Sequence, residues 1–464
     1  MTVWASALSV LLVAAACSSG GDPDGDAMPA AGTPTDSTVS LRDRARDAYI
    51  FTYPLVMNYR TMYRQAIEGD RSFGTWLHRG AATPQDTDIV TPSYDTPYSY
   101  AWVDLRAQPW ILTLPPIEQN RYYVSQWDDL WGFVLDNPGS VEDGNDGIAV
   151  MLANPEWSGE LPDGVSRVIK GESEFLGSLT RTEMLGSDDG VGPVNQIQQG
   201  YTLQPLSTYL NTPAPAPAPA IEWPAWTEGD ETTEKYWDYV SLLLPFTTDN
   251  PRDQEMYDAL ADLGIKRGEP FDQSSLPQDI REALQGGIDD GLAELEALSQ
   301  GDVKSEDVFG DREKMGTDYV NRALGVYMGI FGNTTDQAVY FPMTADAGGE
   351  PLDGSTASYS LTFAPGQLPP AENFWSLTMY RLPERLLVAN PTNRYSIGSS
   401  TPGVRENSDG STTFYFSAND PGGDKASNWL PAPDGPFWLV LRTYGPGQAI
   451  LDKTWQPPKI EKMS

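Results

Sequence analysis

The alternation of proline and alanine in TPAPAPAPA, residues 212–220, limits the fold of this chain more than any other feature. Proline has no backbone N–H, so a segment with proline at every second position can neither continue a helix nor pair as an internal strand. We therefore expect residues 211–220 to be an extended, semi-rigid linker at the surface. The parts of the chain on its two sides are expected to fold as separate segments.

Residues 40–210, before the linker, combine a helical pattern with strand patterns. Apolar residues recur at helical spacing from Leu41 to Leu55, and Pro54 is expected to kink or divide this helix. From about residue 90 to 205, short alternating runs are interrupted by Pro, Gly, Asn and Asp, which is typical of an antiparallel sandwich or barrel. This part is therefore expected to form an N-terminal helix and a first β-sandwich.

After the linker, the pattern is helical over residues 221–338 and returns to strands over residues 339–464. Gly286, Gly287 and Gly291 lie within one of the helical repeats, where glycine either weakens a helix or lets another segment approach closely. The later runs, including NFWSLTMY and PFWLVLRTYG, are separated by turn-forming dipeptides and predict a second set of strands.

The first residues, MTVWASALSVLLVAAACSSGGD, form an apolar run that ends in small residues, which is typical of a secretory signal. Val13 to Ala16 resemble the lipobox of bacterial lipoproteins, which implies cleavage before Cys17 and acylation of its sulfur. Residues 1–17 are therefore expected to be a lipoprotein signal peptide, and residues 18–39 a flexible tether. The alternative is a cysteine that happens to lie in a signal peptide. We expect a secreted protein at the bacterial cell envelope that contacts the membrane only through its lipid anchor.

The charge of the chain excludes one class of partner. Thirty Lys and Arg residues against sixty-five Asp and Glu residues give a formal net charge of −35. Phosphate binding depends on clustered basic side chains, so no nucleic-acid partner is expected.

The residue types also limit metal and nucleophile chemistry. His78 is the one histidine, which excludes multi-histidine metal centres, and a lipidated Cys17 would leave no free thiol. No cofactor is therefore expected. Calcium is the one metal that the residue types permit, at the acidic turns 143–147, 187–190 and 419–424, although ordinary Asp-Gly turns explain these segments better.

The stretch TPSYDTPYSYAWVDLR, residues 91–106, gives the best indication of a site. If it is an extended strand, alternate side chains share one face, and we expect that face to line a surface that is open to a ligand. The members of this face are Tyr98, Tyr100, Trp102, Asp104 and Arg106.

Carboxylates within aromatic strands are candidates for acid and base catalysis, because water is scarce around them. Asp104, Arg106 and Asp128 are the catalytic candidates on this ground, and a purely structural ion pair between Asp104 and Arg106 is the alternative. The residues predicted to bind a ligand lie on the aromatic strand, on a later strand or at strand ends: Tyr94, Asp95, Tyr98, Tyr100, Trp102, Arg181, Asn393, Arg394, Tyr395, Asn428 and Trp429.

Two parts of the chain resemble a paired bacterial family of domains of unknown function, numbered 1254 and 1214. The first resemblance covers about residues 45–210 and includes TPSYDTPYSYAWVDLR and RYYVSQWDDL. The second covers about residues 340–460, where FWSLTMY, NRYSIG, DGS, NWLPAP and LRTYGP occur in the order of the family. The resemblance implies a mainly β fold with helical additions (α+β), in which two antiparallel jelly-roll-like β-sandwiches are similar to double jelly-roll capsid proteins. It implies no established reaction.

Three functions remain open from the sequence. The favoured one is the binding of a small amphipathic or sugar-like ligand in an aromatic pocket at the cell envelope. The second is a hydrolase that uses carboxylate, Tyr and Arg groups in the same pocket. The third is a capsid-like structural protein that assembles as a homo-oligomer.

Overall fold

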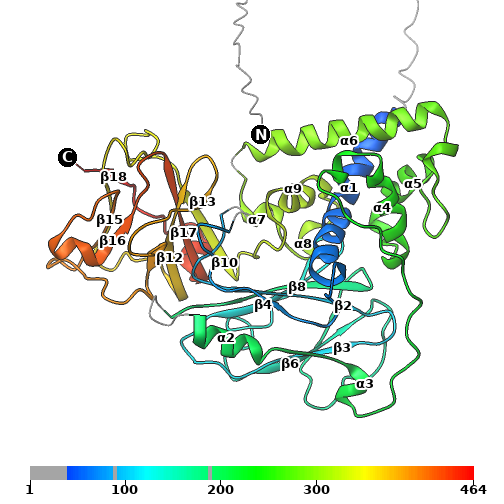
Figure 1. The fold of residues 1–464 in the computed structure, drawn as a ribbon, viewed down its shortest axis with the longest axis horizontal. Helices are drawn as coiled ribbons and strands as arrows, with labels where there is room; N and C mark the ends of the chain where they lie inside the picture. The colour runs from blue at the N-terminus through cyan, green and yellow to red at the C-terminus, as the bar shows by residue number, and fades with distance from the viewer. Residues whose placement is uncertain (1–38, 87–90, 186–190, 302, 464) are drawn as a thin grey trace, which may run out of the picture. The chain divides into compact units, whose positions relative to one another are not determined.

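The computed structural model of the chain describes residues 39–86, 91–185, 191–301 and 303–463 (Figure 1). Cys17, the predicted signal peptide and the predicted tether up to residue 38 lie outside the described residues. From Ser40 onward, the contacts of the chain group it into one unit. No helix within the described ranges is both long and apolar enough to cross a bilayer.

The first β-sandwich consists of two sheets, whose strand orders are β1-β2-β8-β4-β5 and β7-β6-β3-β9. The strands of the first sheet are β1 (Leu77–His78), β2 (Tyr98–Asp104), β8 (Phe175–Thr182), β4 (Tyr123–Asp129) and β5 (Val134–Asp136). Those of the second sheet are β7 (Val168–Lys170), β6 (Ile148–Ala153), β3 (Trp110–Leu114) and β9 (Thr202–Pro205). Val103, Leu112 and Trp127 belong to the core that the two sheets enclose. The short helices α2 (Val191–Gln199) and α3 (Leu206–Tyr209) flank β9 in the chain.

The second β-sandwich also consists of two sheets. In the first sheet, the strands follow the order β10 (Ala338–Met343), β17 (Phe437–Pro446), β12 (Ala371–Arg381) and β13 (Leu386–Leu387), and β14 (Ser396–Gly398) pairs with β12. In the other sheet, the order is β16 (Trp429–Pro431), β15 (Thr412–Ser417), β11 (Tyr359–Phe363) and β18 (Glu461–Lys462). Leu377, Phe414 and Leu441 belong to its core. The helix α10 (Gln448–Leu451) follows β17.

The sheets are not purely antiparallel, which corrects one part of the expected fold. β6 pairs with β7 in parallel, and β15 pairs with β16 in parallel. A parallel pair requires a crossover connection, and residues 154–167 and 418–428 supply the two connections. The expected class of β sheets with helical additions is otherwise present.

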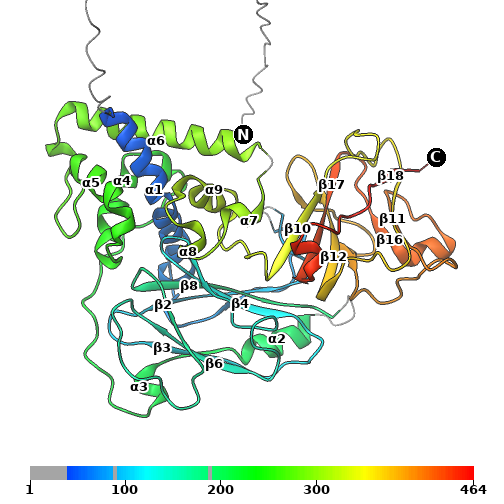
Figure 2. The same ribbon diagram turned by 180° about the vertical axis from the view of Figure 1, so that it is seen from behind.

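Helices form a layer against the first sandwich. They are α1 (Leu41–Met62), α4 (Lys235–Leu243), α5 (Gln254–Asp262), α6 (Gln278–Ser299), α7 (Ser305–Val308), α8 (Arg312–Met315) and α9 (Tyr319–Gly329). Both ribbon views show α1 beside α6 (Figure 1 and Figure 2). Residues 212–227, which include the proline and alanine run, contain neither helix nor strand. The expectation that Pro54 divides the first helix is wrong, because α1 continues through it. The burial of α1 from Ala48 to Tyr59 offsets the missing N–H of Pro54.

The glycines of α6 allow the close approach of α1. A Cβ atom added at Gly287 would lie 2.5 Å from the carbonyl carbon of Ala45, and one added at Gly291 would lie 2.5 Å from the ring of Tyr49. Real Cβ atoms do not come this close to other atoms, so only glycine permits this spacing of the two helices. Of the two roles predicted for these glycines, the close approach of another segment is therefore confirmed.

Candidate functional site

The aromatic strand alternates as expected, but both of its faces are covered. Ala101 and Val103 of β2 point into the core of the first sandwich. Tyr100 and Trp102, on the other face, are 7% and 1% exposed and pack in the core that also contains α1. Trp102 donates its Nε1–H to Gln65 Oε1 at 2.9 Å. An open, lined surface was expected along this face. That expectation is wrong for Tyr100 and Trp102, because the core that contains α1 covers them.

Asp104 and Arg106 form a bidentate ion pair at the end of the same strand. Arg106 Nη2 lies 2.6 Å from Asp104 Oδ2, and its Nη1 donates to the carbonyl of Pro219 at 2.9 Å. The guanidinium also lies 5.4 Å from the ring centroid of Phe175. Through the hydrogen bond of Arg106 to Pro219, the pair therefore holds the proline and alanine linker against the first sandwich, which is a structural role.

A small pocket lies between the segment before β2 and the strands β12 and β14 of the second sandwich. Its volume is about 40 Å³. The lining residues come from both sandwich segments of the chain: Tyr94, Asp95, Met184, Phe374, Trp375, Ser376, Asn393, Arg394, Ser396, Gly398, Ser400 and Thr401. Four of the residues predicted to bind a ligand thus meet at one place: Tyr94, Asp95, Asn393 and Arg394.

Asp95 is the half-buried acid of this pocket. Ser376 Oγ donates to Asp95 Oδ2 at 2.6 Å, and Ser396 Oγ donates to its other oxygen. Burial raises the pKa of the Asp95 carboxyl, while the two serine hydroxyls and the more distant charge of Arg442 oppose the rise. The carboxyl is therefore closer to protonation at neutral pH than an ordinary aspartate.

Glu183 is a second acid beside the pocket; it is fully buried, and no sequence pattern indicated it. Its Oε1 accepts a hydrogen bond of 2.7 Å from Ser400, and its Oε2 accepts one of 2.8 Å from the backbone of Tyr122. Burial raises the pKa of Glu183 to about 7. Two acids with raised pKa values therefore lie at the junction of the sandwiches, each hydrogen-bonded to serines of the pocket wall.

The turn residues predicted as ligand contacts divide into two groups. Arg394 lines the pocket and donates its Nη1–H to the carbonyl of Trp429 at 2.9 Å. Tyr395 packs edge-on against Tyr94, with ring centroids 5.1 Å apart. Asn428 instead binds backbone carbonyls of its own sandwich, and Trp429 donates to Ser417 in the same way. Asn428 and Trp429 lie outside the residues that line the pocket.

Two further predicted residues, Asp128 and Arg181, lie deeper at the junction. Gln126 connects them, since its Nε2 donates to Asp128 Oδ1 at 3.0 Å and its Oε1 accepts from Arg181 at 3.0 Å. Arg181 lies over the ring of Tyr98 at 5.9 Å from the centroid. Asp128 is 3% exposed and does not line the pocket.

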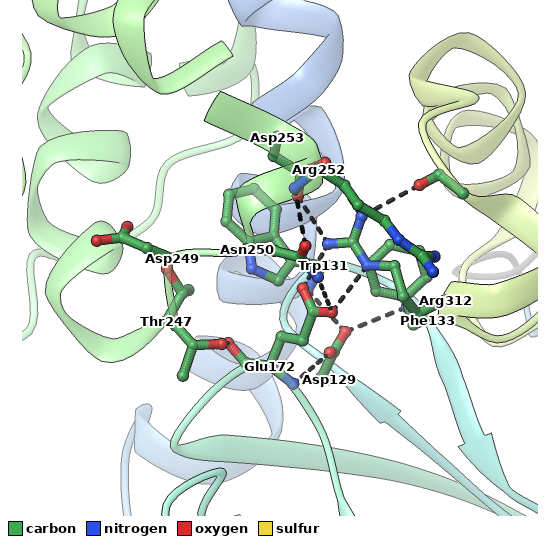
Figure 3. A network of polar contacts seen from close by, with 12 residues as sticks. Asp129, Trp131, Phe133, Glu172, Thr247, Asp249, Asn250, Arg252, Asp253 and Arg312 are labelled. Carbon is green, nitrogen blue, oxygen red and sulfur yellow. Dashed lines mark hydrogen bonds and ion pairs between the residues drawn. The ribbon is translucent and has the colours of Figure 1, made fainter. Parts of the chain in front are cut away.

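A separate ionic network joins the helices to the first sandwich (Figure 3). Arg312 pairs with Glu172 and Asp253, and its guanidinium lies 4.2 Å from the ring centroid of Phe133. Asp129 accepts backbone N–H groups of Trp131, Phe133 and Glu172. Arg312 of α8 thereby connects the helical layer to Glu172, which lies between β7 and β8 of the first sandwich.

The described residues contain no cluster of three or more His, Cys, Asp or Glu side chains that could hold a metal ion. In the turn at 143–147, Asp143 accepts from Arg167 and from the backbone of Gly139. In the turn at 419–424, Asp420 accepts from the backbone of Gly422. The turn at 187–190 lies outside the described residues. Calcium binding stays a prediction.

Comparisons with known proteins agree with this two-part organisation. The family described as a protein of unknown function (DUF1254) matches residues 74–205, and the family described in the same way as DUF1214 matches residues 337–448. Among solved structures, the VPA0106 protein from Vibrio parahaemolyticus is 25% identical with a TM-score of 0.77, over 92% of this chain and 100% of that chain. A putative uncharacterized protein from Burkholderia cenocepacia is 11% identical with a TM-score of 0.42, over 91% of this chain and 94% of its own. No curated protein matches the chain. With both segments present in the expected order, the chain belongs to the proteins that carry a DUF1254 domain followed by a DUF1214 domain.

Proposed function

We propose that this protein binds the polar head of a small amphipathic or sugar-like ligand in the pocket between the segment before β2 and the strands β12 and β14. The observation that carries the proposal is the meeting of a half-buried carboxylate, Asp95, with the aromatic rings of Tyr94 and Trp375 in one hollow. Aromatic faces next to fixed hydrogen-bonding groups are the usual means of holding a ring that has an apolar face and hydroxyl groups.

The size of the hollow limits what it holds. A volume of about 40 Å³ admits a group of a few non-hydrogen atoms, since a buried water needs about 10–15 Å³ measured in the same way. A complete drug-sized molecule would not fit. The ligand would therefore insert one polar group beside Asp95 and leave its remaining atoms near Tyr94 and Asn393.

A thermal-shift screen of monosaccharides and short alkyl glycosides tests this proposal, followed by calorimetric titration of those that raise the melting temperature. Tyr94→Ala removes an aromatic wall and should weaken binding at least tenfold. Tyr415→Ala, on β15 of the second sandwich and outside the pocket, is the matched control and should bind like wild type. Equal loss in both variants, or no binding of any tested glycoside, would contradict the proposal.

A second candidate function is hydrolysis. It is favoured by two acids, the half-buried Asp95 and the buried Glu183, whose environments raise their pKa values and so suit one as proton donor and the other as proton acceptor. A panel of esters, glycosides and amides incubated with wild type and with Glu183→Gln distinguishes the two functions. Turnover that is lost in the variant supports a hydrolase, and absence of turnover in wild type leaves binding as the function.

The location at the cell envelope and the capsid-like assembly are also proposals. Mass spectrometry of membrane-extracted protein should find diacylglycerol on Cys17. Light scattering after size exclusion reports assembly, and a monomer at high protein concentration would argue against a homo-oligomer.

A further inference from the structure

Two arginines are buried at the junction of the sandwiches and face neutral groups. Arg181 on β8 is 6% exposed, and Arg442 on β17 is 4% exposed. A guanidinium carries its charge at any pH that the protein meets, and a buried charge is costly unless it is paired. Within the described residues, neither side chain forms an ion pair with a carboxylate.

The hydrogen bonds of both arginines go to uncharged oxygens. Arg181 donates to Gln126 Oε1 at 3.0 Å and to the carbonyl of Phe331 at 2.6 Å. Arg442 donates to Thr378 Oγ1 at 2.9 Å and to the carbonyl of Thr91 at 3.1 Å. Arg442 also hydrogen-bonds the hydroxyl of Tyr380, and these bonds still leave further donors, since a guanidinium has five N–H groups.

The same tyrosines surround both arginines. Register pairs Tyr98 with Arg181 across β2 and β8, and Tyr340 with Arg442 across β10 and β17. Tyr98, Tyr340 and Tyr444 each interact electrostatically with both guanidinium groups. Tyr98 and Tyr340 are partly exposed, so solvent reaches this set of residues. We refer to Arg181, Arg442 and these three tyrosines as the arginine–tyrosine cluster.

Two carboxylates interact electrostatically with the arginines of the cluster without forming ion pairs with them. Asp128 interacts with Arg181 but is hydrogen-bonded to Gln126, and Asp95 interacts with Arg442 but accepts hydrogen bonds from serines. Burial raises the pKa of both carboxyls, that of Asp128 well above its ordinary value. Among the described residues, neither carboxylate hydrogen-bonds an arginine of the cluster.

An unpaired amide donor adds to the cluster. Asn333 is fully buried, its Oδ1 accepts from the hydroxyl of Tyr340 at 2.7 Å, and its Nδ2 has no hydrogen-bond partner within the described part of the chain. A buried donor without an acceptor is rare in folded proteins. The donors beside Tyr340 therefore exceed the acceptors.

We propose that the arginine–tyrosine cluster is a binding site for a small oxyanion, a carboxylate or phosphate group held between Arg181 and Arg442. The planar fork of a guanidinium matches both kinds of group, and tyrosine hydroxyls donate to the remaining oxygens. None of the five residues of the cluster lines the pocket of Asp95, so the glycoside and the anion are tested as different ligands of different residues.

Inorganic phosphate and acetate are the probes, each added at constant ionic strength with chloride as the reference. Wild-type protein should show a saturable rise in melting temperature and calorimetric binding with one probe or both. The stronger of the two identifies the group as phosphate or carboxylate. Arg442→Gln should weaken binding at least tenfold, and Arg442→Lys should restore part of it, because lysine keeps the positive charge but lacks the guanidinium fork.

Arg322→Gln is the matched control, because Arg322 is 2% exposed but lies among the rings of the helical layer. It should bind the anion like wild type even if the fold is less stable. Tyr340→Phe removes one hydroxyl and no charge, so it reports on the site even if the variants of Arg442 do not fold. Phenylglyoxal labelling of wild type adds a second measurement, since the anion should protect Arg181 and Arg442 and leave Arg322 unaffected. No saturable binding of either probe, or unchanged binding in Arg442→Gln and Tyr340→Phe, would overturn the proposal.

Discussion

The hydroxyl of Ser376 donates a hydrogen bond of 2.6 Å to Asp95, 281 positions earlier in the chain. Ser396 donates to the other oxygen of the same carboxyl. The carboxyl of Asp95, in the first sandwich segment, thereby accepts hydrogen bonds from two strands of the second sandwich, β12 and β14. The acid that lines the pocket is also part of the connection between the two sandwiches.

Replacing this acid should therefore destabilise the fold. Asp95→Ala leaves two buried serine hydroxyls without an acceptor, and each such loss is worth about 1–3 kcal/mol. We expect the free energy of unfolding in urea to fall by on the order of 2–4 kcal/mol. Asp434→Ala, at an exposed position of the second sandwich, should leave it unchanged. Equal stability of the two variants would show that the serine contacts contribute little.

The pH dependence of stability should carry the signature of Glu183. Burial raises its pKa from an ordinary value of 4.5 to about 7 in the folded protein. Below pH 4.5 the carboxyl of Glu183 is protonated in both the folded and the unfolded state, and between pH 4.5 and about 7 it is protonated only in the folded state. The free energy of unfolding should therefore fall as the pH rises through this window and become level above about pH 7. The change from this one group is on the order of 3 kcal/mol.

Glu183→Gln isolates this contribution. The amide does not titrate, so the difference in unfolding free energy between wild type and variant should decrease from pH 4.5 to about pH 7. Urea unfolding at several pH values measures it. Asp129, whose pKa burial raises to about 6, acts in the same direction but is present in both proteins and cancels in the difference. A difference that stays constant with pH would contradict the raised pKa.

Arg312 should be the most sensitive ionic position in the helical layer. Arg312→Met keeps the bulk of the side chain over Phe133 but leaves Glu172 and the fully buried Asp253 without their cation. Breaking a buried pair in this way costs about 3–5 kcal/mol, which thermal or urea unfolding would report. Arg405→Met is the control, since its pair with Asp424 lies 67% and 100% exposed, and no measurable change is expected.

Local patterns in the sequence predicted most of the strands and long helices. The alternation over residues 98–104 and the helical spacing over residues 280–298 are patterns within a single element. They correspond to β2 and α6, respectively. The parallel pairs β6–β7 and β15–β16 were missed because the direction in which two strands pair leaves no signal in the residue pattern of either strand.

The site was predictable only in part, for a related reason. Tyr94, Asp95, Asn393 and Arg394 meet in the pocket, but no periodicity shows that α1 covers Tyr100 and Trp102. Glu183 and the serines of β12 and β14 carry no motif. Arg442 did leave a signal that was not used, because a charged residue within the otherwise apolar run PFWLVLRTYG is unusual for a buried strand.

The packing of α1 on α6 gives a final test, with two glycines as a matched pair. Gly287→Ala places a Cβ atom 2.5 Å from the carbonyl carbon of Ala45, so the helices must separate, at a cost of about 1–3 kcal/mol in unfolding free energy. Gly329→Ala, at the last residue of α9, meets nothing within 4 Å and should be neutral or slightly stabilising, because alanine favours helix. Chemical denaturation of both variants compares the two effects. If Gly287→Ala were as stable as Gly329→Ala, the close approach of α1 to α6 would not be a requirement of the fold.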